Sequence, residues 1–398
     1  MTIEEIKALD EKYFMNTFGA RIPVCFVKGE GMKLWDTEGK VYQDFLAGIA
    51  VSALGHSHPA LVNAIIEQAQ KFIHCSNYYY IEPQAKLAKL IVENSCCDKV
   101  FFANSGAEAN EGAIKLARLF FRKKGLPEKF EIITLEKSFH GRTLATLAAT
   151  GQEKYQKNYS PLTPKFLSVP INDIEALEKA ITQFTCAIML EPIQGESGVN
   201  PTNVDYIQKV RKLCTEKDVL LIFDEVQCGL GRTGKMFGYE HYGVEPDIFT
   251  LAKALGGGFP IGALCAKEPF ASAFEPGDHG STFGGNPLAC HTGYAVLSTI
   301  INDKLYENSE KMGEYLLGKL SALKQKYTFI SEVRGKGLMV GVQFSIPKAV
   351  DIKLKCLEAG YLIGSVGDNI IRMLPPLIIT KEDIDGYIEA LDKILANF

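Results

Sequence analysis

The sequence predicts an α/β fold: a mostly parallel central sheet with helices on both faces, and a smaller α+β domain. Strand, short turn and helix alternate repeatedly from about residue 98, and repeated βα units form parallel sheets. Residues 219–223 are all apolar, which is typical of a strand buried on both faces. After residue 287, longer helices alternate with single strands, so we expect the α+β part there.

The chain of 398 residues suits about two domains. We expect residues 1–50 to form an opening helix and short antiparallel strands around the turns at Gly31 and Gly39. Residues 51–287 are expected to form the large domain. Residues 288–398 are expected to form a small domain that packs with the N-terminal segment.

The period of the apolar residues places the individual elements. In the large domain it predicts strands at 100–103, 132–135, 186–190 and 219–223, and helices at 60–72, 107–121 and 203–217. In the small domain it predicts helices at about 288–303, 305–326 and 350–359 and from residue 381, with strands at 338–344 and 370–373.

The composition narrows the range of partners. The formal net charge is −4, which gives no general attraction for nucleic acid or for an anionic membrane. No apolar run reaches the ~18 residues of a membrane span, and the acidic N-terminus does not read as a signal peptide. The ten cysteines lie in apolar contexts without CxxC spacing, which is typical of reduced thiols. We therefore expect a cytoplasmic protein with a small-molecule partner.

The apolar run at 219–223 ends in Asp224, at the carboxyl end of a strand, where open α/β sheets bind ligands. A carboxylate buried there costs several kcal/mol unless a cationic group meets it. Lys253 lies in the next apolar run, residues 248–255. A lysine in such surroundings is a candidate for a lowered pKa and for Schiff-base chemistry.

A second feature is the turn Ser105-Gly106-Ala107 between a predicted strand and a predicted helix. Free backbone N–H groups at such a helix start can bind a phosphate, although Ser105 as a simple N-cap explains the pattern equally well. Other predicted strand ends bring further candidates to the same edge: Phe139, Arg142, Glu191 and Gln227.

Two other motifs carry less weight. Residues 229–234 match the pattern GxGxxG after a predicted strand. A dinucleotide-binding loop of this pattern must be followed by a helix. The residues after Gly234 show no helical period. His56 and His58 are two residues apart with no third ligand nearby. We interpret them as turn residues and expect no metal site.

Pyridoxal phosphate suits the remaining constellation. Its phosphate would bind at Ser105-Gly106-Ala107, its protonated ring nitrogen would face Asp224, and its aldehyde would form an imine with Lys253. Phe139 could stack on one face of the ring and Val226 could pack on the other, while Gln227 could bond the ring hydroxyl. Taken singly, these three residues are explained equally well by packing or strand capping.

At these residues the chain resembles the class III pyridoxal-phosphate aminotransferases, the ornithine-type subgroup of fold type I. The resemblance runs nearly end to end. It rests on LWDTEGKVYQDFLAGIAV, GHSHP, FFANSGAEANEGAIKLAR, FHGRT, EPIQGE, LLIFDEVQCGLGRTG, LAKALGGGFPIGA, GSTFGGNPLAC and IIRMLPPL.

The resemblance implies further roles. Thr282 would bind the cofactor phosphate across the interface of a homodimer with shared active sites, and Ser281 would lie near the substrate. Arg142 would hold one substrate carboxylate and Arg372 the α-carboxylate of glutamate. Glu191 would pair with Arg372 and release it when glutamate binds.

The resemblance also implies a reaction: transfer of an amino group from a small-molecule donor to 2-oxoglutarate, giving glutamate. We expect N-acetylornithine as donor, in arginine biosynthesis, with ornithine, 4-aminobutyrate and succinyl-diaminopimelate as alternatives. Phe18 stands where relatives usually have tyrosine, which disfavours free ornithine. A pyridoxal-phosphate aminomutase or racemase is a more distant alternative, and a non-catalytic protein leaves Asp224 with Lys253 unexplained.

Overall fold

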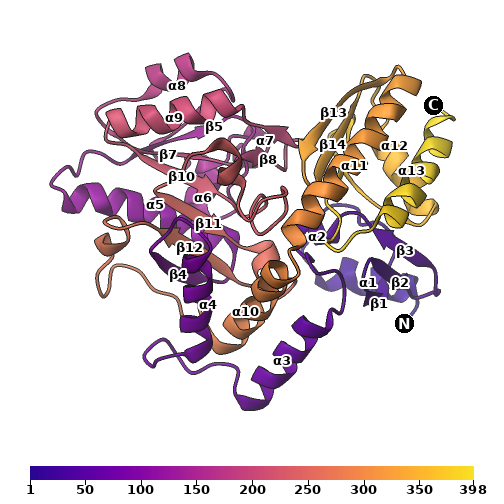
Figure 1. Cartoon of the computed structure of the whole chain (residues 1–398), viewed down its shortest axis with the longest axis horizontal. Helices are drawn as coiled ribbons and strands as arrows, with labels where there is room; N and C mark the ends of the chain where they lie inside the picture. The colour runs from indigo at the N-terminus through magenta and orange to yellow at the C-terminus, as the bar shows by residue number, and fades with distance from the viewer.

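A seven-stranded sheet forms the centre of the larger part of the molecule (Figure 1). The computed structural model describes all 398 residues. The strand order is β4-β12-β11-β10-β7-β5-β6. The strands are β4 (Lys99–Ala103), β5 (Glu131–Leu135), β6 (Phe166–Val169), β7 (Thr185–Leu190), β10 (Leu220–Asp224), β11 (Ile248–Leu251) and β12 (Gly262–Ala266).

The sheet is mostly parallel, as predicted. Only β12 runs antiparallel to its two neighbours, β4 and β11. The sequence analysis did not place β12, because GALCA is short and follows the glycine-rich turn at 256–258, where no apolar period can be followed. The chain enters this antiparallel strand after Lys253, a short 3-10 helix (Lys253–Leu255) and the glycine-rich turn.

Helices cover both faces of the sheet (Figure 1). Every residue of β10 is buried, and its alternate side chains enter two separate hydrophobic clusters. One cluster joins Leu220 and Ile222 to α5 (Gly106–Lys123), and the other joins Leu221 and Phe223 to α9 (Val204–Glu216). The other helices of this part are α3 (Pro59–Lys71), α4 (Glu82–Glu93), α6 (Leu144–Ala149), α7 (Glu153–Gln156) and α8 (Ile174–Ala180).

The smaller part is built from both ends of the chain, as predicted. The N-terminal strands β1 (Phe26–Glu30), β2 (Lys33–Asp36) and β3 (Val41–Asp44) pair antiparallel, after helix α1 (Ile3–Tyr13). The C-terminal strand β15 (Tyr361–Leu362) extends this sheet by pairing with β3. The Phe45 and Tyr387 rings then pack with centroids 4.5 Å apart. The exact division of the chain at 50/51 and 287/288 stays a prediction.

A second small sheet has the order β13-β14-β17-β16. One of its two central strands, β17, carries Arg372. Figure 1 shows the strands β13 and β14 of this sheet next to the larger part of the molecule. The elements are α10 (Pro287–Asn302), α11 (Leu305–Lys326), β13 (Ile330–Lys336), β14 (Met339–Phe344), α12 (Ala349–Glu358), β16 (Gly364–Val366), β17 (Ile370–Met373) and α13 (Lys381–Leu395).

The two motifs of low weight have local structural roles. Gly229 to Gly234 form turns that lead into a short 3-10 helix at Gly238–Tyr242, so this glycine loop does not open the long helix of a dinucleotide site. His58 caps α3 by accepting from the Ala60 amide. None of the helices combines the length and the apolarity that crossing a bilayer requires.

Candidate active site

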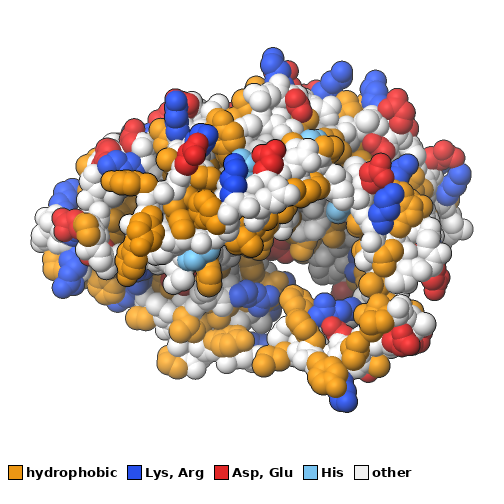
Figure 2. Space-filling model, turned by 90° about the horizontal axis from the view of Figure 1, so that it is seen from below, with side chains coloured by type: hydrophobic (Ala, Val, Ile, Leu, Met, Phe, Trp, Pro, Cys, Tyr) orange, Lys and Arg blue, Asp and Glu red, His pale blue; other side chains and the backbone are white.

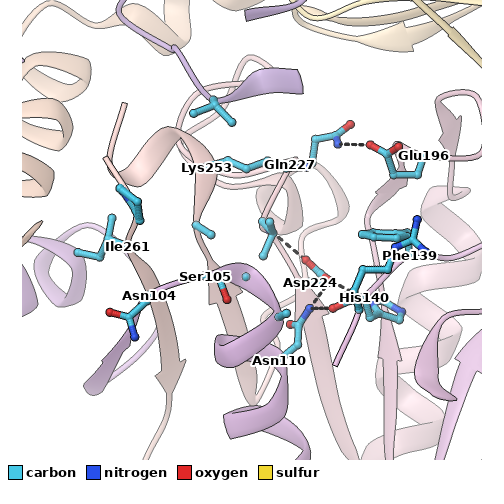
Figure 3. A pocket seen from close by; sticks show the side chains of 18 of the residues that line it. Asn104, Ser105, Asn110, Phe139, His140, Glu196, Asp224, Gln227, Lys253 and Ile261 are labelled. Atoms are coloured by element: carbon cyan, nitrogen blue, oxygen red, sulfur yellow. Dashed lines mark hydrogen bonds and ion pairs between the residues drawn. The ribbon is translucent and has the colours of Figure 1, made fainter. Parts of the chain in front are cut away.

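A cavity of about 390 Å³ lies at the carboxyl ends of the parallel strands, where ligands bind in open α/β sheets. It brings together most of the residues that the sequence singled out, although they come from five separate segments (Figure 3). The predicted residues that line it are Ser105, Gly106, Ala107, Phe139, Arg142, Glu191, Asp224, Val226, Gln227 and Lys253.

Lys253 follows β11 and begins a short 3-10 helix, Lys253–Leu255. Its φ of 46° lies in the left-handed region, which costs a residue with a side chain on the order of 1 kcal/mol. One side of its side chain faces the cavity, so the residue is only half-buried by surface area. The surrounding protein still removes most of the amine's hydration, and this burial lowers the pKa of Lys253. No carboxylate forms an ion pair with the amine, which is therefore free to react.

Asp224 ends β10 and is buried. Its Oδ2 lies 2.8 Å from Asn110 Nδ2 and 2.8 Å from His140 Nδ1, while its Oδ1 accepts from the Val226 amide at 3.0 Å. The Asn110 amide cannot turn over, because its own Oδ1 accepts from Thr250 Oγ1 at 2.7 Å. Figure 3 shows the side chains of Asn110 and His140 directed at the carboxylate of Asp224. These contacts fix the orientation of the Asp224 carboxylate.

Asn110 and His140 were missed by the sequence analysis. A signal for Asn110 existed: it is a polar residue on the apolar face of α5, one turn after Gly106, and a buried polar side chain needs a partner. His140 lies in the motif FHGRT, between Phe139 and Arg142. Its contact with Asp224 joins residues that are 84 positions apart. The sequence around His140 therefore contains no pattern that predicts this contact.

The start of α5 offers backbone donors to an anion. Ser105 is the N-cap, and its Oγ accepts from the Glu108 amide at 3.1 Å. The amides of Gly106 and Ala107 lie in the first turn, where a helix has no acceptors of its own. A Cβ on Gly106 would lie 2.9 and 3.0 Å from the two methyl groups of Val226. Ser105 caps the helix through the Glu108 amide, which leaves the amides of Gly106 and Ala107 for an anion. The capping role and the anion-binding role are therefore compatible.

Arg372 forms an ion pair with Glu196 and not with Glu191, so the predicted pairing is wrong. Its Nη1 and Nη2 lie 2.9 and 3.2 Å from the two Glu196 carboxylate oxygens, and Nη1 also donates to Gly195 O at 2.9 Å. Glu191 accepts instead from the amides of Phe139 at 2.9 Å and Gly195 at 3.2 Å. Glu191 directly follows β7 and points into the sheet edge, whereas Glu196 lies beyond the next turn, opposite β17.

The two carboxylates differ in pKa as well as in position. Burial raises the pKa of Glu191 to about 7, since no arginine is paired with it. Burial alone would raise the pKa of Glu196 too, but the Arg372 guanidinium more than offsets this and keeps it below its ordinary value. Glu196 is therefore an ionised partner that Arg372 must exchange before it binds another carboxylate.

Arg142 lines the cavity from an exposed position, whereas Phe18 does not line it. Arg142 is exposed and makes no hydrogen bond or ion pair; its guanidinium lies over the Tyr155 ring, 4.0 Å from the centroid. Phe18 is exposed too and contacts Phe14 and Arg21 rather than the cavity.

Ser281 and Thr282 do not reach the cavity of their own chain. They line a separate depression with Ser76, Asn77 and Tyr78. Ser281 Oγ accepts from the Gly284 amide at 2.8 Å, while Thr282 is exposed. Their predicted roles therefore depend on a second copy of the chain.

The site combines a reactive lysine, a fixed carboxylate, an anion-binding helix start and two arginines. Together with the doubly covered sheet, these features are typical of an α/β enzyme whose lysine can react with a carbonyl compound. The family profile described as aminotransferase class-III matches residues 14–395. The chain belongs to the class-III aminotransferases.

Relatives and solved structures agree with this membership. The chain is 56% identical to the acetylornithine aminotransferase of Caldanaerobacter subterraneus subsp. tengcongensis, over 98% of both chains. It is 55% identical to that of Methanocaldococcus jannaschii, over 98% of this chain and 97% of the relative. The ornithine aminotransferase structure from Toxoplasma gondii superposes with a TM-score of 0.95 at 34% identity, over 100% of this chain and 96% of that one. The acetylornithine aminotransferase structure from Elizabethkingia anophelis gives 0.90 at 36%, over 100% of each.

The family implies pyridoxal phosphate, and the residues present fit it. Gln227 Oε1 is a buried acceptor without a hydrogen-bond partner, and buried acceptors of this kind normally have a donor; the ring hydroxyl could supply one. The first-turn amides of α5 suit the phosphate, and the Asp224 carboxylate suits a protonated ring nitrogen. The donor and acceptor set thus matches three polar groups of the cofactor.

Proposed function

We propose that this enzyme transfers the amino group of N-acetylornithine to 2-oxoglutarate, giving N-acetylglutamate 5-semialdehyde and glutamate, in arginine biosynthesis. The observation that carries the proposal is the single cavity lined by Lys253, the fixed carboxylate of Asp224 and Arg142. A second arginine, Arg372, pairs with Glu196 of the cavity wall. The names of the relatives at 48–56% identity support the choice of donor.

Pyridoxal phosphate, when bound, supplies the electron sink that a carbanion next to nitrogen requires. Lys253 would bind its aldehyde carbon covalently through Nζ. Once displaced by the incoming amine, the same Nζ would move the proton to and from the substrate carbon. The lowered pKa of Lys253 favours the neutral, basic form. Asp224, held by Asn110 and His140, would keep a proton on the ring nitrogen.

The arginines account for two different substrates in one site. N-acetylornithine carries its carboxylate at the end of the chain remote from the reacting amine, and Arg142 would bind it there. Glutamate has a second carboxylate next to its amine, which would bind Arg372 once Glu196 has swung away. Each guanidinium is planar and presents paired N–H donors that match the two oxygens of a carboxylate, so two arginines suit a substrate with two carboxylates.

The shared homodimer is part of the proposal. Thr282 would reach the partner's cofactor phosphate, with Ser281 near the partner's substrate. Phe283 follows Thr282 in the chain, and Tyr78 lines the same depression as Ser281 and Thr282. Both aromatic side chains are exposed, and exposed apolar patches mark interaction sites. Figure 2 shows that hydrophobic side chains are exposed in several places on the side of the molecule seen from below.

Mixed dimers test the shared site. Lys253→Ala and Thr282→Glu homodimers should each be inactive or nearly so. When their subunits are mixed, half of the dimers are heterodimers, and each of these has one intact site, so about a quarter of wild-type activity should return. No recovery in verified heterodimers would show that each site is made within one chain.

Absorbance and donor choice test the activity itself. The holoenzyme should show a visible band that N-acetylornithine and glutamate bleach and that Lys253→Ala lacks. Ornithine is the second candidate, because the ornithine aminotransferase fold superposes with a TM-score of 0.95. Specificity constants for N-acetylornithine, ornithine, 4-aminobutyrate and succinyl-diaminopimelate decide the donor. A higher value for ornithine would overturn our choice.

The proposed location is the cytoplasm, which the ten free thiols support.

A further inference from the structure

Arg142 is an exposed arginine that only aromatic rings hold in place. Its guanidinium carbon lies 4.0 Å from the centroid of the Tyr155 ring and 5.7 Å from that of Phe139. No carbonyl or carboxylate of the chain accepts from its N–H groups. A freely moving arginine side chain loses about 2 kcal/mol of rotamer entropy when it is fixed. Because the aromatic ring already restricts the Arg142 side chain, part of this loss has occurred before a substrate binds.

The backbone that carries Arg142 is fixed by Glu111 of α5. Its Oε1 accepts from the Thr143 hydroxyl at 2.5 Å and from the amides of Ala145 at 3.1 Å and Thr146 at 3.2 Å. These are the first donors of α6, which begins two residues after Arg142. Arg142 therefore projects from a rigid helix start, and only its side chain remains to be placed.

Tyr155 is fixed independently of Arg142. It lies on α7, whose neighbouring glutamines tie this single turn to the chain on both sides. The carboxamide of Gln156 donates to three carbonyls at the end of α6, and that of Gln152 donates to two carbonyls next to Phe139. The acceptors are Leu147 O at 3.1 Å, Ala148 O at 3.3 Å, Thr150 O at 2.7 Å, Lys137 O at 3.2 Å and Ser138 O at 3.0 Å.

The same ring contacts the residue that faces the cofactor. Phe139 and Tyr155 pack edge to face, with centroids 5.7 Å apart and planes at 77°. The Tyr155 hydroxyl makes no hydrogen bond within the chain, so the ring face and not the hydroxyl supplies the contact. Tyr155 is absent from the lining of the cavity, so it can act on a substrate only through the lining residues that it contacts, Arg142 and Phe139.

We propose that Tyr155 is a positioning residue: its ring holds the Arg142 guanidinium at a set distance from Phe139, with the N–H edge free for a substrate carboxylate. The proposal rests on the carboxylate-binding role of Arg142 in the proposed function. It assigns Tyr155 to substrate affinity, because a prepared guanidinium binds a carboxylate without a further loss of rotamer freedom.

Binding of glutarate tests this without turnover. Glutarate has two carboxylates and no amine or keto group, so calorimetric titration of the holoenzyme reports carboxylate capture alone. Tyr155→Leu should weaken binding roughly 2- to 30-fold, the range that a cation–π contact of about 0.5–2 kcal/mol gives. Tyr155→Phe should bind as the wild type does. The matched control is Tyr159→Leu, an exposed tyrosine of the same segment with no contact to Arg142.

A double-mutant cycle separates positioning from general disturbance. In an Arg142→Ala background, Tyr155→Leu should cause no further loss of glutarate binding. In turnover, Tyr155→Leu should raise KM for glutamate with kcat little changed, and should leave the half-reaction of n-butylamine, which has no carboxylate, unaffected. Equal losses with and without Arg142, a loss in Tyr155→Phe as large as in Tyr155→Leu, or wild-type binding in Tyr155→Leu would each overturn the proposal. A wrong amino donor would show in turnover and leave the glutarate result intact.

Discussion

Glu196 and Arg372 form a two-point ion pair between the turn after β7 and strand β17, at 2.9 and 3.2 Å. In this pair, the guanidinium of Arg372 is already bound to a carboxylate of its own chain, that of Glu196. Any substrate carboxylate that uses this arginine competes with Glu196, whereas a substrate that uses Arg142 alone does not. Under the proposed function, the ion pair would thus distinguish glutamate from N-acetylornithine.

Glu196→Gln should therefore lower KM for glutamate and 2-oxoglutarate, by roughly tenfold if the released ion pair is worth about 1.4 kcal/mol. KM for N-acetylornithine should not change. Initial rates in both directions measure this. Glu332→Gln is the matched control, since Glu332 pairs with Arg334 at 2.6 Å on the exposed edge of the small sheet. Unchanged or raised KM values for the dicarboxylates would contradict the competition.

Asp224→Ala should lower the rate of the glutamate half-reaction by roughly 100-fold or more, because no carboxylate would then keep the ring nitrogen protonated. The protein should still fold, since Asp224 is one residue in a sheet with a large core. Stopped-flow absorbance gives the rate, and circular dichroism checks the fold. A folded variant that holds the cofactor and reacts at a near-normal rate would refute the electrostatic role of Asp224.

Gly106→Ala should weaken cofactor retention several-fold. The new Cβ would lie 2.9 and 3.0 Å from the Val226 methyl groups and 3.5 Å from the Ala252 Cβ, which forces the helix start or Val226 to move. Cofactor dissociation, followed by absorbance during dilution, measures the effect. Val226→Ala removes the obstructing methyl groups, so the double variant should retain cofactor better than Gly106→Ala alone. No recovery in the double variant would point to a cause other than this contact.

Glu225 should make stability depend on pH. Burial raises its pKa to about 8, although the amides of Gly238 and Tyr239 donate to it. Unfolded glutamate loses its proton near pH 4.5 and native Glu225 near 8. The stabilisation is thus complete below about pH 4.5 and is lost as pH rises towards 8.

Glu225→Gln should lack this loss. Between pH 5 and pH 8, the free energy of unfolding of the wild type should fall by roughly 3–5 kcal/mol relative to the variant. Urea unfolding of both holoenzymes at pH 5, 6.5 and 8 tests the sign. Parallel pH profiles would mean that Glu225 titrates normally.

Local sequence was sufficient for much of this protein. Period and apolar runs located β10, α5, α9 and most of the small-domain elements within a few residues, because each element buries a face that its own residues define. Residues at the strand ends, including Asp224, Lys253 and Gly106, could be named for the same reason: parallel strands deliver their carboxyl ends to one edge.

Tertiary structure alone decided which of these residues meet. Glu191 and Glu196 stand five residues apart in EPIQGE, and only the path of the turn determines that the second reaches Arg372. Asn110 and His140 converge on Asp224 from other segments, and Tyr155 reaches Arg142 from a separate turn. The sequence encodes what each side chain can bind; distances between residues far apart in the chain depend on the packing of whole elements, which no local pattern contains.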